Sequence, residues 1–187
     1  MKYKTFNIRF FIVFSVIIAA ALMRLLPHWP NFTPIAAMAL FAGTYFERKR
    51  FAFAIPIVAL FLSDLVLGFH ALMPAIYLGF VVTVVIGSTI KNHVSVKNIA
   101  LGAIASSVIF FLITNFAAWL AFPQFYPQTM VGLAECYIAG LAFFNDGSQG
   151  ISFFVNDMLG TFFFSAVFYG VYFLAHMRFP VIDRSRF

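Results

Sequence analysis

Polar side chains inside long apolar segments are the residues of this sequence most able to do chemistry. Arg24, Asp64, Asn115 and Asp157 each interrupt or end such a segment. Ionisable groups in a membrane-like surrounding are costly, so they usually mark a binding site, a transport path or an internal ion pair. At a rise of 1.5 Å per residue, the last three lie roughly 9–10 Å from the same end of their segments. Their types and spacing predict one polar level shared by several helices.

A ligand-binding pocket is the first interpretation of this level. The two acids would favour a cationic group on a small molecule, and Trp119 would stack on a ring of that molecule. We expect His28 and Asn31 to close the pocket from the loop after the first apolar segment. The candidate ligand-binding residues are Arg24, His28, Asn31, Asp64, Asn115, Trp119, Tyr137 and Asp157.

The same groups also fit a structural network. In that interpretation Arg24 pairs with Asp64 or Asp157, and Asn115 bonds a neighbouring helix, because buried charges are normally paired. The two interpretations are compatible, since a pairing network can also line a binding site.

Two further classes of function stay open as alternatives. One is a metal-binding membrane protein or enzyme that uses His28, His70 and Asp64. The other is a structural subunit of a larger membrane complex, in which every polar group should be paired and no ligand-sized cavity should open outward.

The single cysteine, Cys136, excludes an internal disulfide and a thiolate zinc cluster. No nucleophile elbow, phosphate-binding loop or zinc-protease pattern occurs, so we expect no catalytic residue, no metal and no cofactor.

The elements that carry these residues are apolar enough to lie in a membrane. Of the 187 residues, 63% are hydrophobic, 10% are charged and 28 are phenylalanine. Soluble domains are roughly 45–50% apolar and about 25% charged, and a chain of this length buries only about 70% of its surface. We therefore expect a single integral membrane domain over 1–187. The net charge of +6 lies in short clusters between apolar runs, which excludes nucleic acid as a partner.

Six apolar stretches approach the roughly 20 residues that a spanning helix needs. They predict an all-α integral membrane bundle of six transmembrane helices, at about 6–26, 33–46, 51–69, 73–90, 99–122 and 151–177. Thr33 and Pro34 fit the cap and first position of the second helix. The segment 129–144 is apolar apart from Glu135 and could form a seventh span. We expect instead an interfacial or re-entrant helix on the outer face, between spans five and six.

Basic residues orient the predicted bundle. Eleven of the 12 lysines and arginines flank the six spans on one side, which the positive-inside rule assigns to the cytoplasm. A crossing by 129–144 would break this pattern. The N-terminal segment also resembles a secretory signal that ends near Ala19–Ala21, but we expect it to be kept as the first span. The sequence thus predicts a multi-pass protein of the bacterial inner membrane with both termini in the cytoplasm.

Short stretches scattered over most of the chain carry a family resemblance. They are Arg24–Pro34, Ala39–Gly43, Leu62–Leu65, Thr114–Ala117, Tyr126–Pro127, Gly132–Leu133 and Cys136–Tyr137. These stretches are similar to a largely uncharacterised bacterial six-span membrane family that is related to the substrate-binding (S) subunits of energy-coupling-factor (ECF) vitamin transporters.

The resemblance implies capture of a small, vitamin-like nutrient at the outer face for uptake, without any reaction. It also implies partners besides the ligand and the lipid bilayer, namely a scaffold membrane subunit and cytoplasmic ATPases. The chain departs from S subunits in span one. These subunits commonly carry an Ala-x-x-x-Ala docking motif there, and the nearest equivalent here runs from Ser15 to Ala19. An uptake protein that works alone is therefore the alternative.

Overall fold

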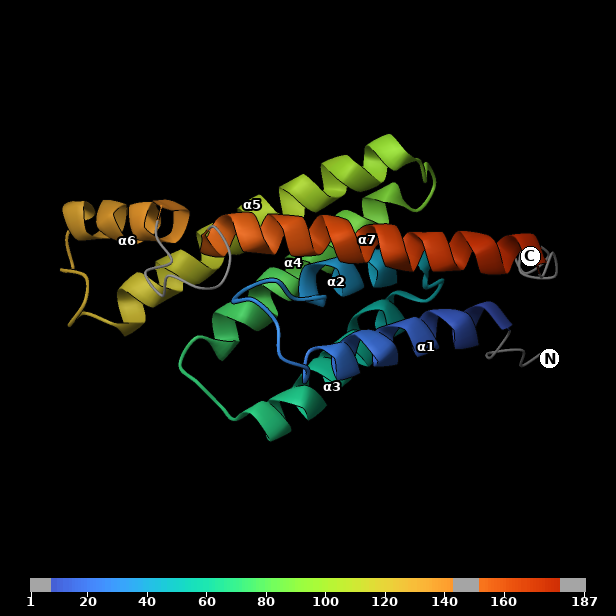
Figure 1. Ribbon diagram of the computed structural model, residues 1–187, viewed down its shortest axis with the longest axis horizontal. Coiled ribbons are helices and arrows are strands. Elements are labelled where there is room, and N and C mark those ends of the chain that lie inside the picture. The colour runs from blue at the N-terminus through green and yellow to red at the C-terminus, as the bar shows by residue number, and fades with distance from the viewer. Residues whose placement is uncertain (1–7, 143–151, 179–187) are drawn as a thin grey trace.

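The computed structural model describes residues 8–142 and 152–178 of the chain, and this part is all-α (Figure 1). The prediction of an all-α fold is confirmed for these residues. The helices run in the order α1 (Ile8–Met23), α2 (Ile35–Tyr45), α3 (Lys49–Leu67), α4 (Met73–Ile90), α5 (Val96–Ala121), α6 (Met130–Ala142) and α7 (Phe153–Arg178).

Helix length and hydropathy indicate a multi-pass membrane protein. Within the described residues, α3, α4, α5 and α7 are long and apolar enough to cross a membrane, and α1, α2 and α6 are shorter apolar helices. We expected α1 and α2 to cross as well, but they have 16 and 11 residues. The predicted first span begins at residue 6, outside the described residues.

Helix α2 is the centre of the bundle. It contacts α1, α3, α4, α5 and α7, and every residue from Ile35 to Thr44 is buried. Its closest neighbour is α4, because two glycines meet at the crossing. A Cβ on Gly43 would lie 2.1 Å from the Val84 carbonyl oxygen, and one on Gly87 would lie 2.2 Å from the Leu40 carbonyl oxygen. Only glycine therefore fits at either position, as small residues allow helix backbones to approach closely.

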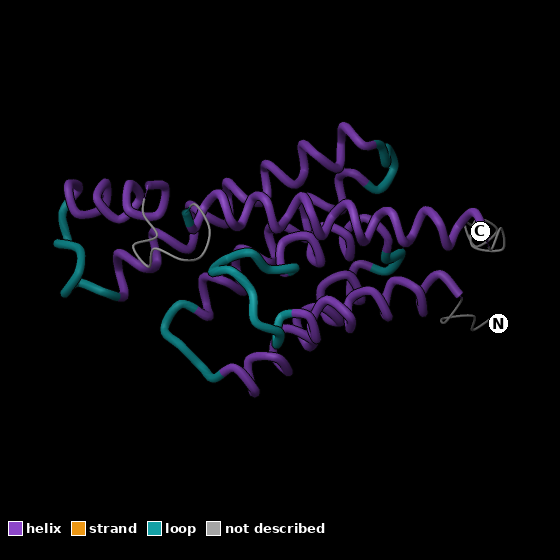
Figure 2. The backbone as a smooth tube through the Cα atoms, in the orientation of Figure 1, coloured by secondary structure: helices purple, strands orange, loops and turns teal. Residues whose placement is uncertain are grey.

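The connecting segments gather at two ends of the bundle (Figure 2). The first end holds the start of α1, the α2–α3 and α4–α5 connections and the last turn of α7 (Figure 1). We call it the basic end, because it carries Arg48, Lys49, Arg50, Lys91, Lys97 and Arg178. The segments 24–34, 68–72 and 122–129 lie toward the opposite end, together with α6.

The caps of α2 and α5 show how the observed helix starts differ from the sequence prediction. Thr33 does not cap α2; its N-cap is Pro34, which makes no side-chain capping bond. Helix α5 begins three residues before the predicted span, because Ser95 caps it by accepting a hydrogen bond from the Asn98 backbone nitrogen at 3.2 Å. A serine at this position satisfies one of the free N–H groups of the first turn.

The segment predicted as an interfacial helix forms α6, which packs against α5 and α7. Its 13 residues rise about 20 Å, less than the roughly 30 Å of a bilayer core. Close packing on the preceding segment holds its start, since a Cβ on Gly132 would lie 2.0 Å from the Pro127 carbonyl oxygen. The last two residues of the predicted helix, 143 and 144, lie outside the described residues.

Candidate ligand-binding site

A partly open cavity of about 1230 Å³ lies among the helices at the end of the bundle opposite the basic end. We call this the cavity end. The cavity is lined by residues of helices α2 to α7 and of the α1–α2, α3–α4 and α5–α6 connections. Of the eight predicted ligand-binding residues, five line it, and they are Arg24, His28, Asn31, Asn115 and Asp157. The other three, Asp64, Trp119 and Tyr137, are not among its lining residues.

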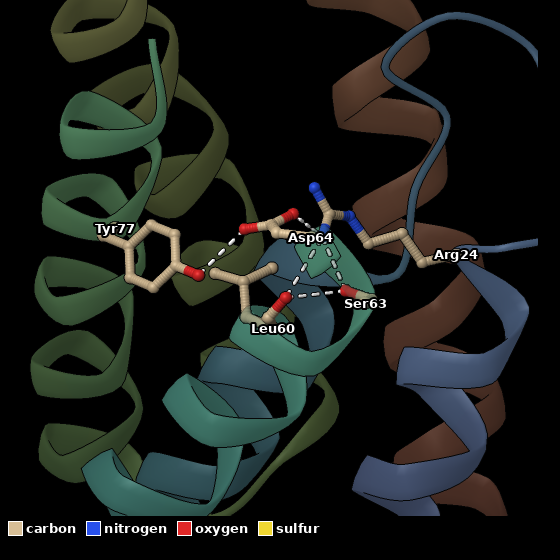
Figure 3. A network of polar contacts seen from close by, with 5 residues as sticks. All are labelled: Arg24, Leu60, Ser63, Asp64 and Tyr77. Atoms are coloured by element: carbon tan, nitrogen blue, oxygen red, sulfur yellow. Dashed lines mark hydrogen bonds and ion pairs between the residues drawn. The ribbon is translucent and has the colours of Figure 1, made fainter. Parts of the chain in front are cut away.

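Asp64 is held in an ion pair beside the cavity. It is 1% exposed, and its Oδ1 accepts a hydrogen bond from Nη1 of Arg24. Its Oδ2 accepts one from the Tyr77 hydroxyl at 2.8 Å (Figure 3). Both carboxylate oxygens are therefore used within the protein. The structural interpretation of the sequence, in which Arg24 pairs with an acid on a neighbouring helix, holds for Asp64.

Arg24 belongs to both the ion pair and the cavity. Besides Asp64, its Nη1 donates to the Ser63 hydroxyl at 2.6 Å and approaches the Leu60 carbonyl oxygen at 3.4 Å. The second terminal nitrogen makes none of the contacts that are drawn in Figure 3. Arg24 follows directly after α1, and its side chain reaches the last turns of α3. It therefore fixes the start of the α1–α2 connection against α3.

Asp157 has a different environment. It lies on α7, is 6% exposed and lines the cavity. Its Oδ2 has no hydrogen-bond partner among the described residues. The Ser107 hydroxyl of α5 lies within hydrogen-bonding reach of the carboxyl group and also donates to the Thr161 hydroxyl at 3.2 Å. Of the two acids that the sequence placed at the polar level, Asp157 is thus the one with a carboxylate oxygen that has no partner among the described residues.

Asn115 lies where α6 crosses α5. Its Nδ2 donates to the Phe111 carbonyl oxygen of its own helix at 2.9 Å, so the side-chain amide does not make the predicted bond to a neighbouring helix. The contact with α6 instead runs through the backbone, because the Cys136 thiol donates to the Asn115 carbonyl oxygen at 3.4 Å. A Cβ on Gly140 would lie 2.6 Å from Asn115 Oδ1, so this oxygen rests against α6 at the cavity wall.

The α1–α2 connection is fastened to the start of α7. Asn156 is 1% exposed and donates from Nδ2 to the Pro30 carbonyl oxygen at 3.0 Å. Asn31 donates from Nδ2 to the Phe153 carbonyl oxygen at 3.5 Å and has a φ of 61°, which asparagine tolerates better than most residues. His28, in the same connection, is exposed and lines the cavity. These bonds place His28 and Asn31 at the cavity, where we expected a lid.

Trp119 and Tyr137 satisfy their polar atoms elsewhere. Trp119 donates from Nε1 to the Pro127 carbonyl oxygen at 2.8 Å, and Gln128 donates back to the Trp119 carbonyl oxygen at 2.6 Å. Tyr137 donates its hydroxyl to the Leu112 carbonyl oxygen at 2.8 Å. An indole N–H or phenol O–H in apolar surroundings takes a nearby acceptor, and the backbone supplies it here. The two rings hold the α5–α6 region together instead of lining the cavity.

The sequence prediction missed most of the cavity wall. Phenylalanine and tyrosine side chains from α5, the α5–α6 connection and the start of α7 form much of it, and they are Phe110, Phe122, Phe125, Tyr126 and Phe153. Burial raises the pKa of the Tyr126 hydroxyl, so it stays protonated and can donate a hydrogen bond. With 28 phenylalanines in the chain, no local pattern distinguishes those that face a cavity from those that face lipid or core.

The family assignment comes from comparison with known proteins. Residues 4–182 match the model of a family of unknown function, DUF6580. The chain belongs to this family. No curated protein matches it, and no solved structure does.

The arrangement suits binding. The cavity offers a buried carboxylate oxygen, the amide of Asn115, the hydroxyls of Thr33, Thr114 and Tyr126, and aromatic faces. Within residues 8–142 and 152–178, no group of three histidine, cysteine, aspartate or glutamate side chains could hold a metal ion. The geometry therefore gives no support to the alternative metal site built from His28, His70 and Asp64.

Proposed function

We propose that this protein is a membrane substrate-binding subunit that captures a small, vitamin-like nutrient at the outer face for uptake. The cavity carries this proposal. Its volume of about 1230 Å³ is at least that of ordinary small-molecule sites, which span roughly 300–1,000 Å³. A few polar groups among mostly apolar and aromatic walls is the usual composition of such sites.

The distribution of charge supports an outward-facing cavity. The basic end carries Arg48, Lys49, Arg50, Lys91, Lys97 and Arg178. Basic residues beside membrane spans favour the cytoplasmic side, so the cavity end faces outward in the bacterial inner membrane and both termini lie in the cytoplasm. Arg24 lies toward the cavity end instead. Its charge is neutralised by the ion pair with Asp64, so it does not affect the orientation of the protein in the membrane.

The resemblance of the sequence to a family related to ECF S subunits supports the same proposal. In this proposal α1, α2, α3, α4, α5 and α7 form an S-subunit-like bundle of six transmembrane helices. The stretches that resemble the related bacterial family supply cavity residues: Arg24–Pro34 contributes Arg24, His28, Asn31 and Thr33, and Thr114–Ala117 contributes Thr114 and Asn115. The partners would be a scaffold membrane subunit and cytoplasmic ATPases. Ser15 and Ala19 are both exposed on α1, where such a scaffold would dock.

Asp157 weighs against a purely structural subunit. A protein whose polar residues only join helices should pair them, because an unsatisfied buried acceptor is costly. Asp157 Oδ2 lacks a partner among the described residues and lies at a cavity large enough for a ligand.

Native mass spectrometry of gently purified protein tests the proposed function. We expect a small-molecule adduct at one copy per chain, and Ala118→Trp should abolish it by placing a bulky indole ring in the cavity that Ala118 lines. Ala121→Trp is the matched control, because Ala121 is exposed at the end of the same helix and is not a lining residue. Absence of an adduct from the parent protein, or its survival in Ala118→Trp, would contradict the proposal.

A further inference from the structure

We propose that the occupant of this cavity is an organic cation, whose protonated nitrogen pairs with the Asp157 carboxylate. The inference rests on the proposed function, because it names the chemical class of the molecule that the same cavity takes. It narrows the expectation from the sequence, in which Asp64 and Asp157 both faced the ligand.

The balance of charge around the cavity leads to this class. Arg24 lines the cavity, but Asp64 compensates it directly behind the wall. Glu135 is exposed on α6 and is not a lining residue. Among the described residues, the Asp157 carboxylate is therefore the lining acid that has no ion-pair partner. Buried charges are normally paired, and a cationic ligand supplies the missing partner.

The hydrogen bonds around Asp157 point to a nitrogen donor. Oδ2 is buried without a partner in the described part of the chain, and an ionised carboxylate only accepts hydrogen bonds. Ser107 of α5 stands beside the carboxyl group, but its single hydroxyl hydrogen is directed to the Thr161 hydroxyl at 3.2 Å, so Ser107 does not supply the donor that Oδ2 lacks. A ligand N–H directed at Oδ2 would complete the arrangement and add a charge-assisted bond, which is stronger than a neutral one.

The aromatic wall indicates that the cation is organic and ring-bearing. Five phenylalanine and tyrosine rings line the cavity, and aromatic faces attract cations and stack on other rings. A bare metal ion would need several oxygen or nitrogen ligands, and the described residues offer no group of three ionisable ligands for one. The volume of about 1230 Å³ also far exceeds what a metal or ammonium ion would fill.

Three indole compounds of similar size and different charge test the inference. Tryptamine is cationic, tryptophol is neutral and indole-3-acetate is anionic at neutral pH. Each is added at about 10 mM, since ligands of this size often bind weakly, and the rise in melting temperature of detergent-purified protein is measured. We expect tryptamine to raise it clearly and the other two to have little effect. An equal or larger rise with tryptophol or indole-3-acetate, or no rise with tryptamine, would overturn the cation assignment.

Two variants locate the charge responsible. Asp157→Asn should weaken tryptamine binding by about 30-fold or more, because it removes one partner of a buried charge pair. Glu135→Gln makes the same chemical change at an exposed position and should bind like the parent protein. Unchanged tryptamine binding by a folded Asp157→Asn variant would overturn the assignment. If that variant does not fold, the comparison of the three compounds on the parent protein still tests whether the ligand is a cation. Equal binding of all three compounds would refute only the cation, whereas the native mass spectrometry decides the proposed function itself.

Discussion

Removal of the Arg24 guanidinium should destabilise the bundle by about 3–5 kcal/mol, because it leaves the Asp64 carboxylate buried without its counter-ion. Arg24→Met is the suitable change, since methionine fills similar space without a charge or a donor. The loss should be large for a side chain at the end of a helix. Nη1 alone reaches Asp64, Ser63 and the Leu60 carbonyl oxygen, so a single substitution removes every one of these contacts.

The magnitude follows from the burial of the pair. The side chains of Arg24 and Asp64 are 10% and 2% exposed, so water cannot replace the lost partner of the carboxylate. After Arg24→Met, the Asp64 carboxylate keeps, among the described residues, only the hydrogen bond from the Tyr77 hydroxyl. Tyr77→Phe is the lesser perturbation. It deletes one hydrogen bond to a charged acceptor, worth about 1.5–3 kcal/mol, and leaves the ion pair intact.

The free energy of unfolding in mixed micelles, obtained by titration with sodium dodecyl sulfate, measures these effects. Glu135→Gln is the control and should stay within about 0.5 kcal/mol of the parent protein, because Glu135 is exposed. The double variant Arg24→Met/Asp64→Asn should be more stable than the sum of the single losses, since neither charge is then left alone. The reasoning is refuted if the two losses add, or if Arg24→Met costs less than Tyr77→Phe.

Three further predictions concern packing, a tether and the single thiol. Gly87→Ala should cost about 3 kcal/mol or more of unfolding free energy, because its Cβ would meet backbone at 2.2 Å. Gly170→Ala, with no atom within 4 Å of its Cβ, should be neutral or gain up to about 1 kcal/mol in the same titration; equal losses would contradict the helix crossing. Asn156→Ala should cost about 1–2 kcal/mol by leaving the Pro30 carbonyl oxygen unpaired, and an unchanged melting temperature would argue against the tether. Burial raises the pKa of the Cys136 thiol, so maleimide labelling should be slower at neutral pH than that of an exposed cysteine and should still increase with pH where an ordinary thiol has reached its plateau; fast labelling at neutral pH would contradict its burial.

Local chemistry made the helical segments predictable. Hydropathy and the breaks between apolar runs placed α4 at its observed bounds, 73–90, and α3, α5 and α7 within three residues of theirs. The central position of α2 in the bundle could not be predicted from the sequence. Each of its residues is apolar or small, so the sequence shows no polar face that would distinguish a helix surrounded by five others from one that faces lipid.

The sequence predicted how deep the polar side chains lie along their helices, but not which way they point. Counting residues along a helix gives the depth of a side chain, and Asp157 and Asn115 do reach the same cavity. The count does not give the rotation of each helix about its axis. Trp119 lies one turn from Asn115, yet its side chain turns toward the Pro127 carbonyl oxygen and does not line the cavity. Phenylalanines line it instead, and nothing in the sequence distinguishes them from the other phenylalanines.

The sequence by itself determined that this chain is helical and membrane-embedded, that its basic residues gather at one end, and that a few polar groups lie toward the other. These properties follow from composition and spacing along each helix. Only the tertiary structure decided which acid Arg24 neutralises. The packing of α1 beside α3 gives it Asp64, whereas α7 leaves Asp157 Oδ2 without a partner in the described residues. Charge pairing depends on which helix faces lie together, and that is set by contacts between residues far apart in the chain.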